Sequence, residues 1–303
     1  MDTCNGIRRA RPLLGTFVDI AAADAARPAM ESAIEAAFAA VAQVHRLMSF
    51  HDPDSDVSRV NRDAGARAVA VHPWTYHVIE TALELHRGSN GAFDIAVAPV
   101  LQNLGMLSRT GNDTQPIPAA ASTADAIELL AGHSVRFRKH DAAIDLGGIA
   151  KGFAVDRAVA VLRGCGVARG LVNAGGDLAA FGHLPETVHI RDPRDPSRLL
   201  CHVEIADAAL ASSGPRFDPL QSNDIQSSAV IDPLTQAPVR DIAGASVLAP
   251  SCMIADALTK VVMIAGETAT DLLARHKASA LAVLKSGDIR VTPDWRHAVR
   301  LAA

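Results

Sequence analysis

Apolar residues recur at steps of three and four along four stretches of the chain. These stretches are residues 34–48, 74–86, 151–164 and 253–265. Such spacing is typical of amphipathic helices, whose apolar side chains share one face. A glycine stands at or just after the end of the last two stretches, as is common at helix C-termini. We therefore expect four helices.

Short apolar runs between these stretches predict strands. One strand is expected over 13–21, and residues 134–138 are expected to pair with 142–146 as a hairpin. From 170 to 211, apolar runs alternate with turn-forming residues, which favours antiparallel strands, and a further strand is expected over 245–249. The pattern predicts an α+β fold instead of a regular βαβ alternation.

Two polar segments predict loops. Residues 51–61, HDPDSDVSRVN, are rich in turn formers and are expected to form an ordered loop with short caps. Residues 107–124 are rich in Gly, Pro, Ser, Thr and Asn, which predicts a variable surface excursion. Catalytic residues are not expected in residues 107–124.

Composition narrows the class of protein. The chain has 303 residues, of which 49% are hydrophobic and 20% charged, so it can form a sizeable core. The net charge of -4 is spread without long runs of one sign, so no footprint for nucleic acid is present. The expected partner is a small molecule or a protein.

The cysteines and the N-terminal sequence bear on the compartment. Cys4, Cys165, Cys201 and Cys252 are far apart, which excludes a zinc-finger spacing and argues against a disulfide framework. The N-terminal sequence lacks the apolar core of a signal peptide, and no run long enough for a transmembrane segment occurs. We expect a cytoplasmic protein; a periplasmic one would follow if an export segment had been trimmed.

The segment 144–156, IDLGGIAKGFAVD, is the best candidate for binding an anion. A predicted strand ends near Asp145, two glycines allow close approach of the backbone, and the free N–H groups of a helix start beside Lys151. The alternative is a tight turn with Lys151 as a solvated residue of the first helical turn. For this motif alone the two interpretations stay open.

Other patterns carry less information. Asp256 and Lys260 are four residues apart, so they share one face of the last helix, which is most often a surface ion pair. The twelve histidines do not occur at metal-ligand spacing, and the segment 164–170, GCGVARG, is not a dinucleotide fingerprint. The motifs of P-loop, zinc-protease and serine-hydrolase sites are missing from the sequence.

Eight ordered segments resemble the ApbE family of flavin transferases, FAD:protein FMN transferases. The segments are LGT (14–16), MSFHDPDSDVSRVN (48–61), GAFDIAVAPVLQNLG (91–105), IDLGGIAKGFAVDRA (144–158), LVNAGGDLAAFG (171–182), ASSG (211–214), VIDPLTQAPV (230–239) and APSCMIADALTK (249–260). Together they cover almost the whole chain.

The resemblance implies a fold and an activity. The expected fold is a single T-fold-like α+β domain over 1–303, with mixed or antiparallel sheets and packed helices. The expected activity is Mg²⁺-dependent transfer of FMN from FAD to a threonine hydroxyl of an acceptor protein, with release of AMP. The acceptor threonine would be the nucleophile, which agrees with the lack of a serine-hydrolase motif.

The resemblance also implies site residues. Gly148, through its carbonyl, and Asp256 would bind the metal, and Asp145 and Lys151 would contact FAD. The positions of the other flavin contacts in the family correspond to Leu14, His51, Ala92, Phe93, Asp94 and Val230. A hard cation and a lysine suit the concentrated negative charge of a pyrophosphate.

The chain departs from the family pattern at Lys260. A threonine that ligates the metal usually stands there, whereas here Thr259 is one place early and about 100° round the helix. A protonated lysine has donors and no acceptor, so it cannot ligate Mg²⁺. Either water and substrate oxygens complete the metal's shell, or the Lys260 ammonium takes part of the cation's place.

A second departure falls in the segment 228–236, which reads SAVIDPLTQ where the family usually has HHIIDPxTG. Ser228 and Ala229 replace two histidines. If one histidine removes the threonine proton, its loss costs about 10²- to 10⁴-fold in rate. Asp256 or Asp232 is then the alternative base. Two alternative functions follow: a non-catalytic FAD-binding module, and an FAD pyrophosphatase without a protein acceptor.

Overall fold

The computed structural model describes residues 6–108, 124–214 and 230–302. Contacts divide the chain into two compact units. The first unit comprises residues 1–43, 151–230 and 238–303, and the second comprises 44–150 and 231–237. In the described part of the chain, no helix has the length and apolar character needed to cross a membrane.

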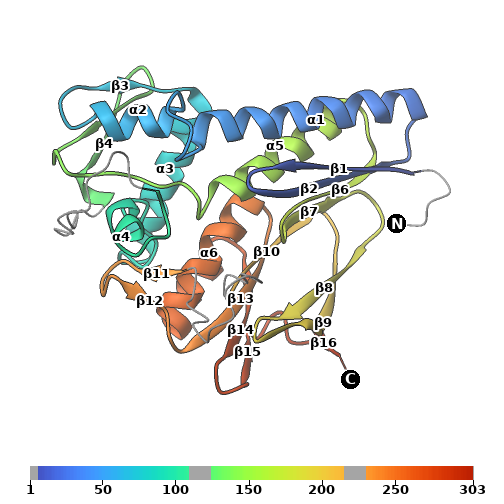
Figure 1. The fold of residues 1–303 in the computed structure, drawn as a ribbon. Coiled ribbons are helices and arrows are strands. Elements are labelled where there is room, and N and C mark those ends of the chain that lie inside the picture. The colour runs from blue at the N-terminus through green and yellow to red at the C-terminus, as the bar shows by residue number, and fades with distance from the viewer. Residues whose placement is uncertain (1–5, 109–123, 215–229, 303) are drawn as a thin grey trace. The chain divides into compact units, whose positions relative to one another are not determined.

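An eight-stranded sheet forms the centre of the first unit (Figure 1). Its order is β1-β2-β6-β7-β10-β13-β14-β15, and each neighbouring pair is antiparallel. The strands are β1 (Gly6–Leu13), β2 (Thr16–Ala23), β6 (Arg169–Ala174), β7 (Asp177–Phe181), β10 (Ala208–Ser213), β13 (Ile242–Ala249), β14 (Ser279–Leu284) and β15 (Ile289–Val291).

A small second sheet packs on this one. It has the order β16-β9-β8, with β8 at Glu186–Asp192, β9 at Asp195–Ile205 and β16 at Arg300–Leu301. Residues of β8 are alternately buried and exposed, so Val188 and Ile190 point inward to join Leu178 of β7 and Leu210 of β10 in one apolar cluster. Burial of these apolar side chains holds the two sheets together.

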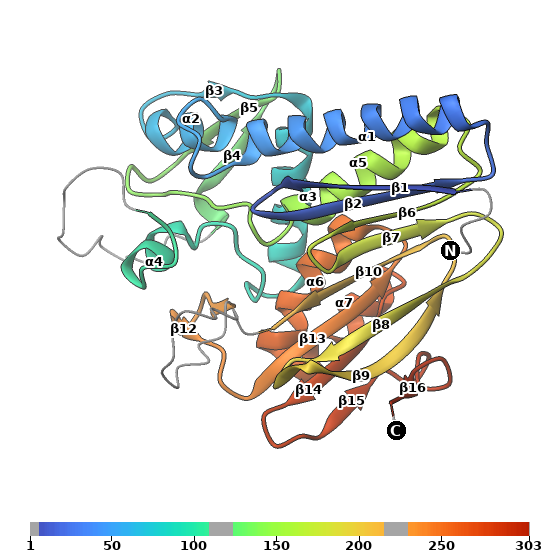
Figure 2. The ribbon, with the colours of Figure 1, turned by 45° about the vertical axis from the view of Figure 1, so that its right-hand side comes forward.

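Helices account for the rest of the first unit. They are α1 (Arg27–Met48), α5 (Ala150–Gly164), α6 (Cys252–Ala265), the 3₁₀ turn η3 (Gly266–Ala269) and α7 (Thr270–Arg275). Helix α6 packs against β7, β10, β13 and β14 (Figure 2) and is buried almost all round. Ser251 caps its N-terminus, and Gly266, with φ of 56°, ends it.

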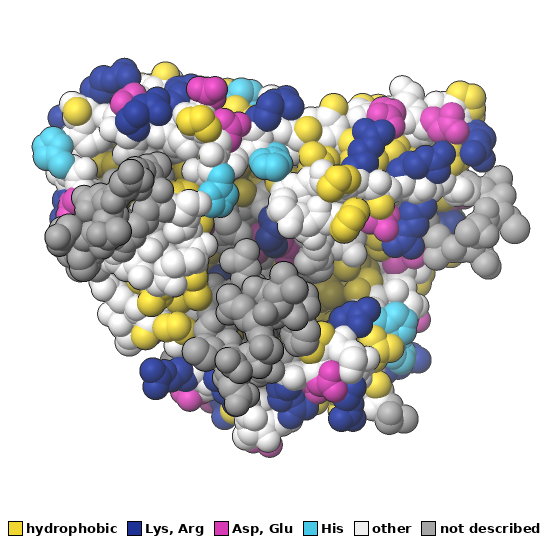
Figure 3. Space-filling model, viewed as in Figure 1, with side chains coloured by type: hydrophobic (Ala, Val, Ile, Leu, Met, Phe, Trp, Pro, Cys, Tyr) yellow, Lys and Arg dark blue, Asp and Glu magenta, His cyan; other side chains and the backbone are white. Residues whose placement is uncertain are grey.

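Charged side chains of the first unit lie mainly on its outer surface. In Figure 3, side chains of both signs are interspersed over β1, β2 and α1. The ion pairs of β1, β2 and α1 include Arg8–Asp19, Arg11–Glu35 and Arg27–Glu31. This mixture agrees with the absence of a single-sign patch in the sequence.

The second unit is mostly helical. Its elements are α2 (Asp56–Asp63), α3 (Pro73–Gly88), α4 (Ala98–Asn103), the 3₁₀ turn η2 (Ala124–Ala126), and a sheet of order β3-β5-β4 formed by Val69–Ala70, Ser134–Phe137 and Ile127–Leu130. Strands β11 (Ile231–Asp232) and β12 (Ala237–Pro238) pair with each other. The buried Asp56 accepts hydrogen bonds from His72 N and Thr75 Oγ1, which fastens α2 to the start of α3.

All four expected helices are confirmed, as α1, α3, α5 and α6, and so is the α+β class with antiparallel sheets. The expectation of one domain over the whole chain stays a prediction. The predicted excursion over 107–124 lies almost entirely outside the described residues, as do Ser228 and Ala229.

Two expected elements in the N-terminal half differ in part from the structure. The strand expected over 13–21 is found as β2, but it begins only at Thr16, because Leu14 and Gly15 adopt φ of 57° and 70° and turn the chain between β1 and β2. The loop expected over 51–61 contains helix α2, which begins where Ser55 accepts a hydrogen bond from Ser58 N. A short helix has too few turns to show a periodic pattern.

The expected hairpin of 134–138 with 142–146 is also wrong. Strand β5 pairs with β3 and β4, and residues 142–146, all of them described, form no strand. The amide of Asn61 instead exchanges two hydrogen bonds with the Ile144 backbone, at 2.8 and 2.9 Å. A distant side chain therefore satisfies the backbone that a partner strand was expected to pair.

Candidate functional site

The predicted site residues fall in both units. Those in the first unit are Leu14, Lys151, Val230, Asp256 and Lys260. Those in the second are His51, Ala92, Phe93, Asp94, Asp145, Gly148 and Asp232.

In the first unit, Lys151 forms an ion pair with Asp177. Lys151 lies in the first turn of α5, and Asp177 begins β7 directly after the two-residue turn Gly175–Gly176. Both glycines have positive φ, 66° and 102°, as a tight hairpin of this kind requires. The Asp177 side chain is 1% exposed, so the hairpin presents a buried carboxylate to the lysine.

Asp256 lies on α6 and is fully buried. Its Oδ2 accepts the backbone N–H of Gly152 at 3.1 Å. The two helices approach closely here, because a Cβ at Gly152 would lie 2.2 Å from the Cys252 carbonyl oxygen. Only glycine permits this approach.

Lys260 lies one helical turn after Asp256, and its ammonium group contacts Asp256. Nζ contacts Asp256 Oδ1 and donates to the Asp256 carbonyl oxygen at 2.9 Å. The hydroxyl of Thr259 donates to the same Asp256 carbonyl oxygen and also bonds to Ser213 Oγ, both at 2.7 Å. The Asp256–Lys260 pair is therefore not the solvated surface pair that spacing alone favours.

Lys151, Asp177, Asp256 and Lys260 make up what we call the charge cluster, with two carboxylates and two ammonium groups. Burial by itself lowers the pKa of Lys151, but the carboxylates of Asp256 and Asp177 outweigh it and raise that pKa above its ordinary value. Burial, followed by the Asp256 carboxylate, raises the pKa of Asp177 against the opposing effect of the two lysines.

The charge cluster, as arranged, does not fit a Mg²⁺ ion bound by Asp256. Mg²⁺ requires oxygen ligands in near-octahedral geometry. Asp256 Oδ1 and Asp177 Oδ2 each lie against a lysine ammonium, and Asp256 Oδ2 accepts an N–H. Within the described ranges, no group of three His, Cys, Asp or Glu side chains could hold a metal.

Asp156, at the end of the motif that begins at Ile144, fixes the start of α6. Its carboxylate accepts from Ser251 Oγ at 2.7 Å and from the backbone N–H groups of Cys252 and Met253 at 2.8 and 2.9 Å. Burial raises the pKa of Asp156, and these three hydrogen bonds oppose that effect. This cap sets where Asp256 stands relative to α5.

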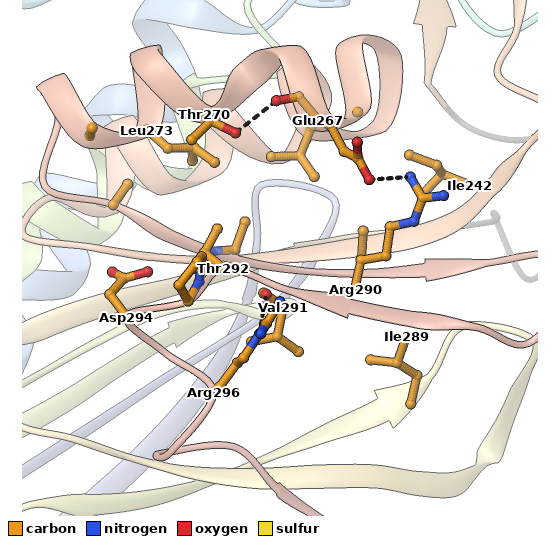
Figure 4. Close-up of a pocket in the computed structure, with 17 residues that line it drawn as sticks. Ile242, Glu267, Thr270, Leu273, Ile289, Arg290, Val291, Thr292, Asp294 and Arg296 are labelled. Atoms are coloured by element: carbon orange, nitrogen blue, oxygen red, sulfur yellow. Dashed lines mark hydrogen bonds and ion pairs between the residues drawn. The ribbon is translucent and has the colours of Figure 1, made fainter.

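A cavity of about 440 Å³ lies in the first unit, and none of the four charge-cluster residues lines it. It is lined by Gly176, next to Asp177 in the chain, and by Ser213, the hydrogen-bond partner of Thr259. A second cavity, of about 650 Å³, lies under α7 (Figure 4). Its charged side chains already have partners, such as Arg290 with Glu267 at 3.0 Å, and it contains none of the predicted site residues.

In the second unit, Asp94 organises a buried turn. Its carboxylate accepts the N–H groups of Ala96 at 2.7 Å and Ala124 at 3.1 Å. The neighbouring Phe93 is buried, and its carbonyl oxygen lies 3.0 Å from His86 Nδ1. Burial raises the pKa of Asp94, although its hydrogen bonds and His86 lower it in part. Ala92 is buried beside them.

Asp145 is held by its own turn. Its N–H donates to the Ile95 carbonyl at 2.8 Å, and Oδ2 accepts from Gly147 N at 3.1 Å. Burial raises the pKa of Asp145, against the effect of the Gly147 hydrogen bond and of His51. His51 itself is exposed, and its Nδ1 lies 3.0 Å from Ser108 Oγ.

The remaining predicted residues lie at turns. Asp232 accepts from Leu234 N at 2.9 Å and Thr235 Oγ1 at 3.0 Å, so its carboxylate closes the β11–β12 turn. Val230 is buried, and Leu14 occupies the β1–β2 turn. Gly148 lies in the turn that precedes α5.

Asp177 and Ser213 were not singled out from the sequence. Asp177 had a signal: it is a charged residue directly after a glycine pair and at the head of the apolar run LAAF. Ser213 had none, because its role depends on α6 packing against β10, which brings Thr259 within reach. Contacts of this kind come from tertiary structure.

Known proteins resemble the chain in sequence and fold. Residues 14–284 match the ApbE family. Among curated relatives, an FAD:protein FMN transferase of Vibrio cholerae is 27% identical over 81% of this chain and 77% of its own length. One of Treponema pallidum is 28% identical over 88% of this chain and 80% of its own length.

Among solved structures, the ApbE protein of Thermotoga maritima is 26% identical, covers 97% of this chain and 99% of its own, and superposes with a TM-score of 0.85. That likeness confirms the expected ApbE architecture. Because the family match spans most of the sequence, the chain belongs to the ApbE family.

Proposed function

We propose that this chain transfers FMN from FAD to a threonine hydroxyl of an acceptor protein and releases AMP. Its relatives are FAD:protein FMN transferases, and it shares their family over 14–284. The observation within the chain that carries the proposal is the charge cluster, which holds two ammonium groups at the positions where the family resemblance puts contacts to FAD and metal.

The proposed reaction is an exchange at phosphorus. The threonine oxygen attacks the phosphorus of the FMN half, the bond to the bridging oxygen breaks, and its electron pair leaves with AMP. The hydroxyl proton passes to a base, for which Asp256 and Asp232 remain the candidates. Lys151 and Lys260 would offset the charge that develops on the phosphate oxygens.

The resemblance also implies that the reaction requires Mg²⁺, and this requirement is part of the proposal. A divalent ion, when bound, would polarise the phosphate oxygens. The Lys260 ammonium already contacts Asp256, the residue expected to hold such an ion. The other contacts that the resemblance implies remain predictions. The metal contact is Gly148, and the FAD contacts are Leu14, His51, Ala92, Phe93, Asp94, Asp145 and Val230.

The test combines FAD, an acceptor domain with its target threonine, and the same domain with that threonine changed to valine. AMP is measured by chromatography, and acceptor-bound flavin by intact mass, with Mg²⁺ or with EDTA. Flavin on the threonine domain alone, with one AMP per flavin, supports the proposal. AMP without acceptor flavin would indicate an FAD pyrophosphatase, and FAD binding without AMP a non-catalytic module.

A further inference from the structure

The side chain of Lys260 is held in place by Asp256 at two points. Nζ contacts Oδ1 of the carboxylate and donates to the carbonyl oxygen of the same residue at 2.9 Å. The lysine side chain is 17% exposed and the aspartate side chain is fully buried. A pair bound in this way is not a freely moving surface contact.

The other oxygen atoms of Asp256 are also engaged. Oδ2 accepts the Gly152 N–H, and the carbonyl oxygen additionally accepts the Thr259 hydroxyl. Each partner is a hydrogen-bond donor, so a metal ion at the carboxylate would have to displace the Lys260 ammonium.

Charge balance points the same way. The charge cluster contains two carboxylates and two ammonium groups, so it is neutral as it stands. Adding a divalent cation would leave an excess of positive charge in a buried place. If a neutral residue replaced Lys260, Lys151 would be the only ammonium group beside the two carboxylates. The excess negative charge would then attract a cation.

We propose that the Lys260 ammonium takes the place of a divalent cation on Asp256, so that the protein supplies this positive charge from its own chain. The part of the inference that concerns metal binding stands on the geometry alone. The part that concerns phosphate stabilisation rests on the proposed function.

The first test is a titration of the full chain with Mn²⁺ in the absence of FAD. The electron paramagnetic resonance signal of unbound Mn²⁺ measures how much of the ion has bound. We expect the wild-type protein to show no saturable binding below about 1 mM. Lys260→Thr removes the ammonium and adds an oxygen, so we expect at least about tenfold tighter binding. The matched control is Lys285→Thr, at an exposed lysine outside the charge cluster, which should behave as wild type.

Two further variants make the result specific. Lys260→Met removes the charge without adding an oxygen and is expected to bind Mn²⁺ less tightly than Lys260→Thr, but more tightly than wild type. Adding Asp256→Asn to Lys260→Thr should abolish the gain. Circular dichroism confirms folding, and if Lys260→Thr does not fold, Lys260→Met decides. Wild-type binding as tight as that of a folded Lys260 variant overturns the inference.

AMP release then tests the phosphate half of the inference. Wild-type activity should persist in EDTA within about twofold, whereas Lys260→Thr should require added metal. Wild-type AMP release that stops in EDTA overturns this half. If no AMP forms under any condition, the proposed function fails, while the Mn²⁺ titration still decides whether Lys260 excludes a metal.

Discussion

The charge cluster and the turn around Asp94 hold their buried carboxylates in different ways. In the charge cluster, Asp177 lies against the ammonium group of Lys151, and Asp256 lies against that of Lys260. Asp94 instead accepts two backbone N–H groups, from Ala96 and Ala124. The first arrangement depends on balanced charge, whereas the second depends on hydrogen bonds from backbone N–H groups, so the two should respond differently to the same change from Asp to Asn.

The largest effect is expected for Asp177→Asn. The change keeps the side-chain size but leaves Lys151 without its direct partner, and breaking a buried pair on one side costs about 3 kcal/mol of unfolding free energy. Urea denaturation measures the loss. The double variant Lys151→Met/Asp177→Asn should recover part of it, because no unpaired ammonium remains. Additive losses would show that the pair is not coupled and would remove the contrast with Asp94.

The next largest effect is expected for Gly152→Ala. The new Cβ would lie 2.2 Å from the Cys252 carbonyl oxygen and 2.8 Å from Asp256 Cβ, so α5 and α6 must move apart. Overpacking of this kind costs about 2 kcal/mol, and the shift also lengthens the Gly152 N–H contact to Asp256.

Gly164→Ala, at the other end of α5, is the matched control. A Cβ there meets nothing within 4 Å, so the change should be neutral or stabilising by up to about 1 kcal/mol. Thermal unfolding of both variants decides. Equal melting temperatures would mean that close packing of α5 on α6 is not needed to hold Asp256.

A smaller, pH-dependent effect is expected for Asp94→Asn. An amide offers only one acceptor atom for the two backbone N–H groups, which costs about 1 kcal/mol. Burial raises the pKa of Asp94 in the folded protein, so its contribution to stability is present below the unfolded pKa and is lost as pH rises through the folded pKa.

The difference in unfolding free energy between wild type and Asp94→Asn should therefore decrease from about pH 4 to pH 7. Urea midpoints across that range measure it. A gap that widens with rising pH would mean that the ionised carboxylate is favoured in the fold, as in a charge-paired site, and would contradict the contrast drawn between the two regions.

The parts of the site that were predictable from sequence are those with a local signal. Helical spacing placed Asp256 and Lys260 one turn apart, and the pair is found on α6. The glycines of the motif IDLGGIAKG predicted a turn before a helix, and α5 begins there. These features depend on residues within a few positions of one another, so the pattern contains them.

Long-range partners were not predictable. Lys151 was expected to face an anion or solvent, but its partner Asp177 is 26 positions away and reaches it through the Gly175–Gly176 turn. Ile144 was expected in a strand, but Asn61, 83 positions earlier, takes up its backbone groups. In both cases tertiary contacts override the local preference, which a single sequence does not record.

The smallest effect is expected at the exposed pair Arg8–Asp19, which separates burial from charge pairing itself. The distance between Arg8 Nη2 and Asp19 Oδ2 is 2.7 Å, and the side chains are 66% and 22% exposed. Arg8→Met should change the unfolding free energy by about 0.5 kcal/mol or less, since water and salt screen such pairs. Urea denaturation at low salt and at about 1 M salt should show that this small loss vanishes when the Debye length shrinks to about 3 Å, whereas the loss in Asp177→Asn should persist. A loss in Arg8→Met as large as that in Asp177→Asn would mean that pairing alone, and not burial, makes the charge cluster sensitive.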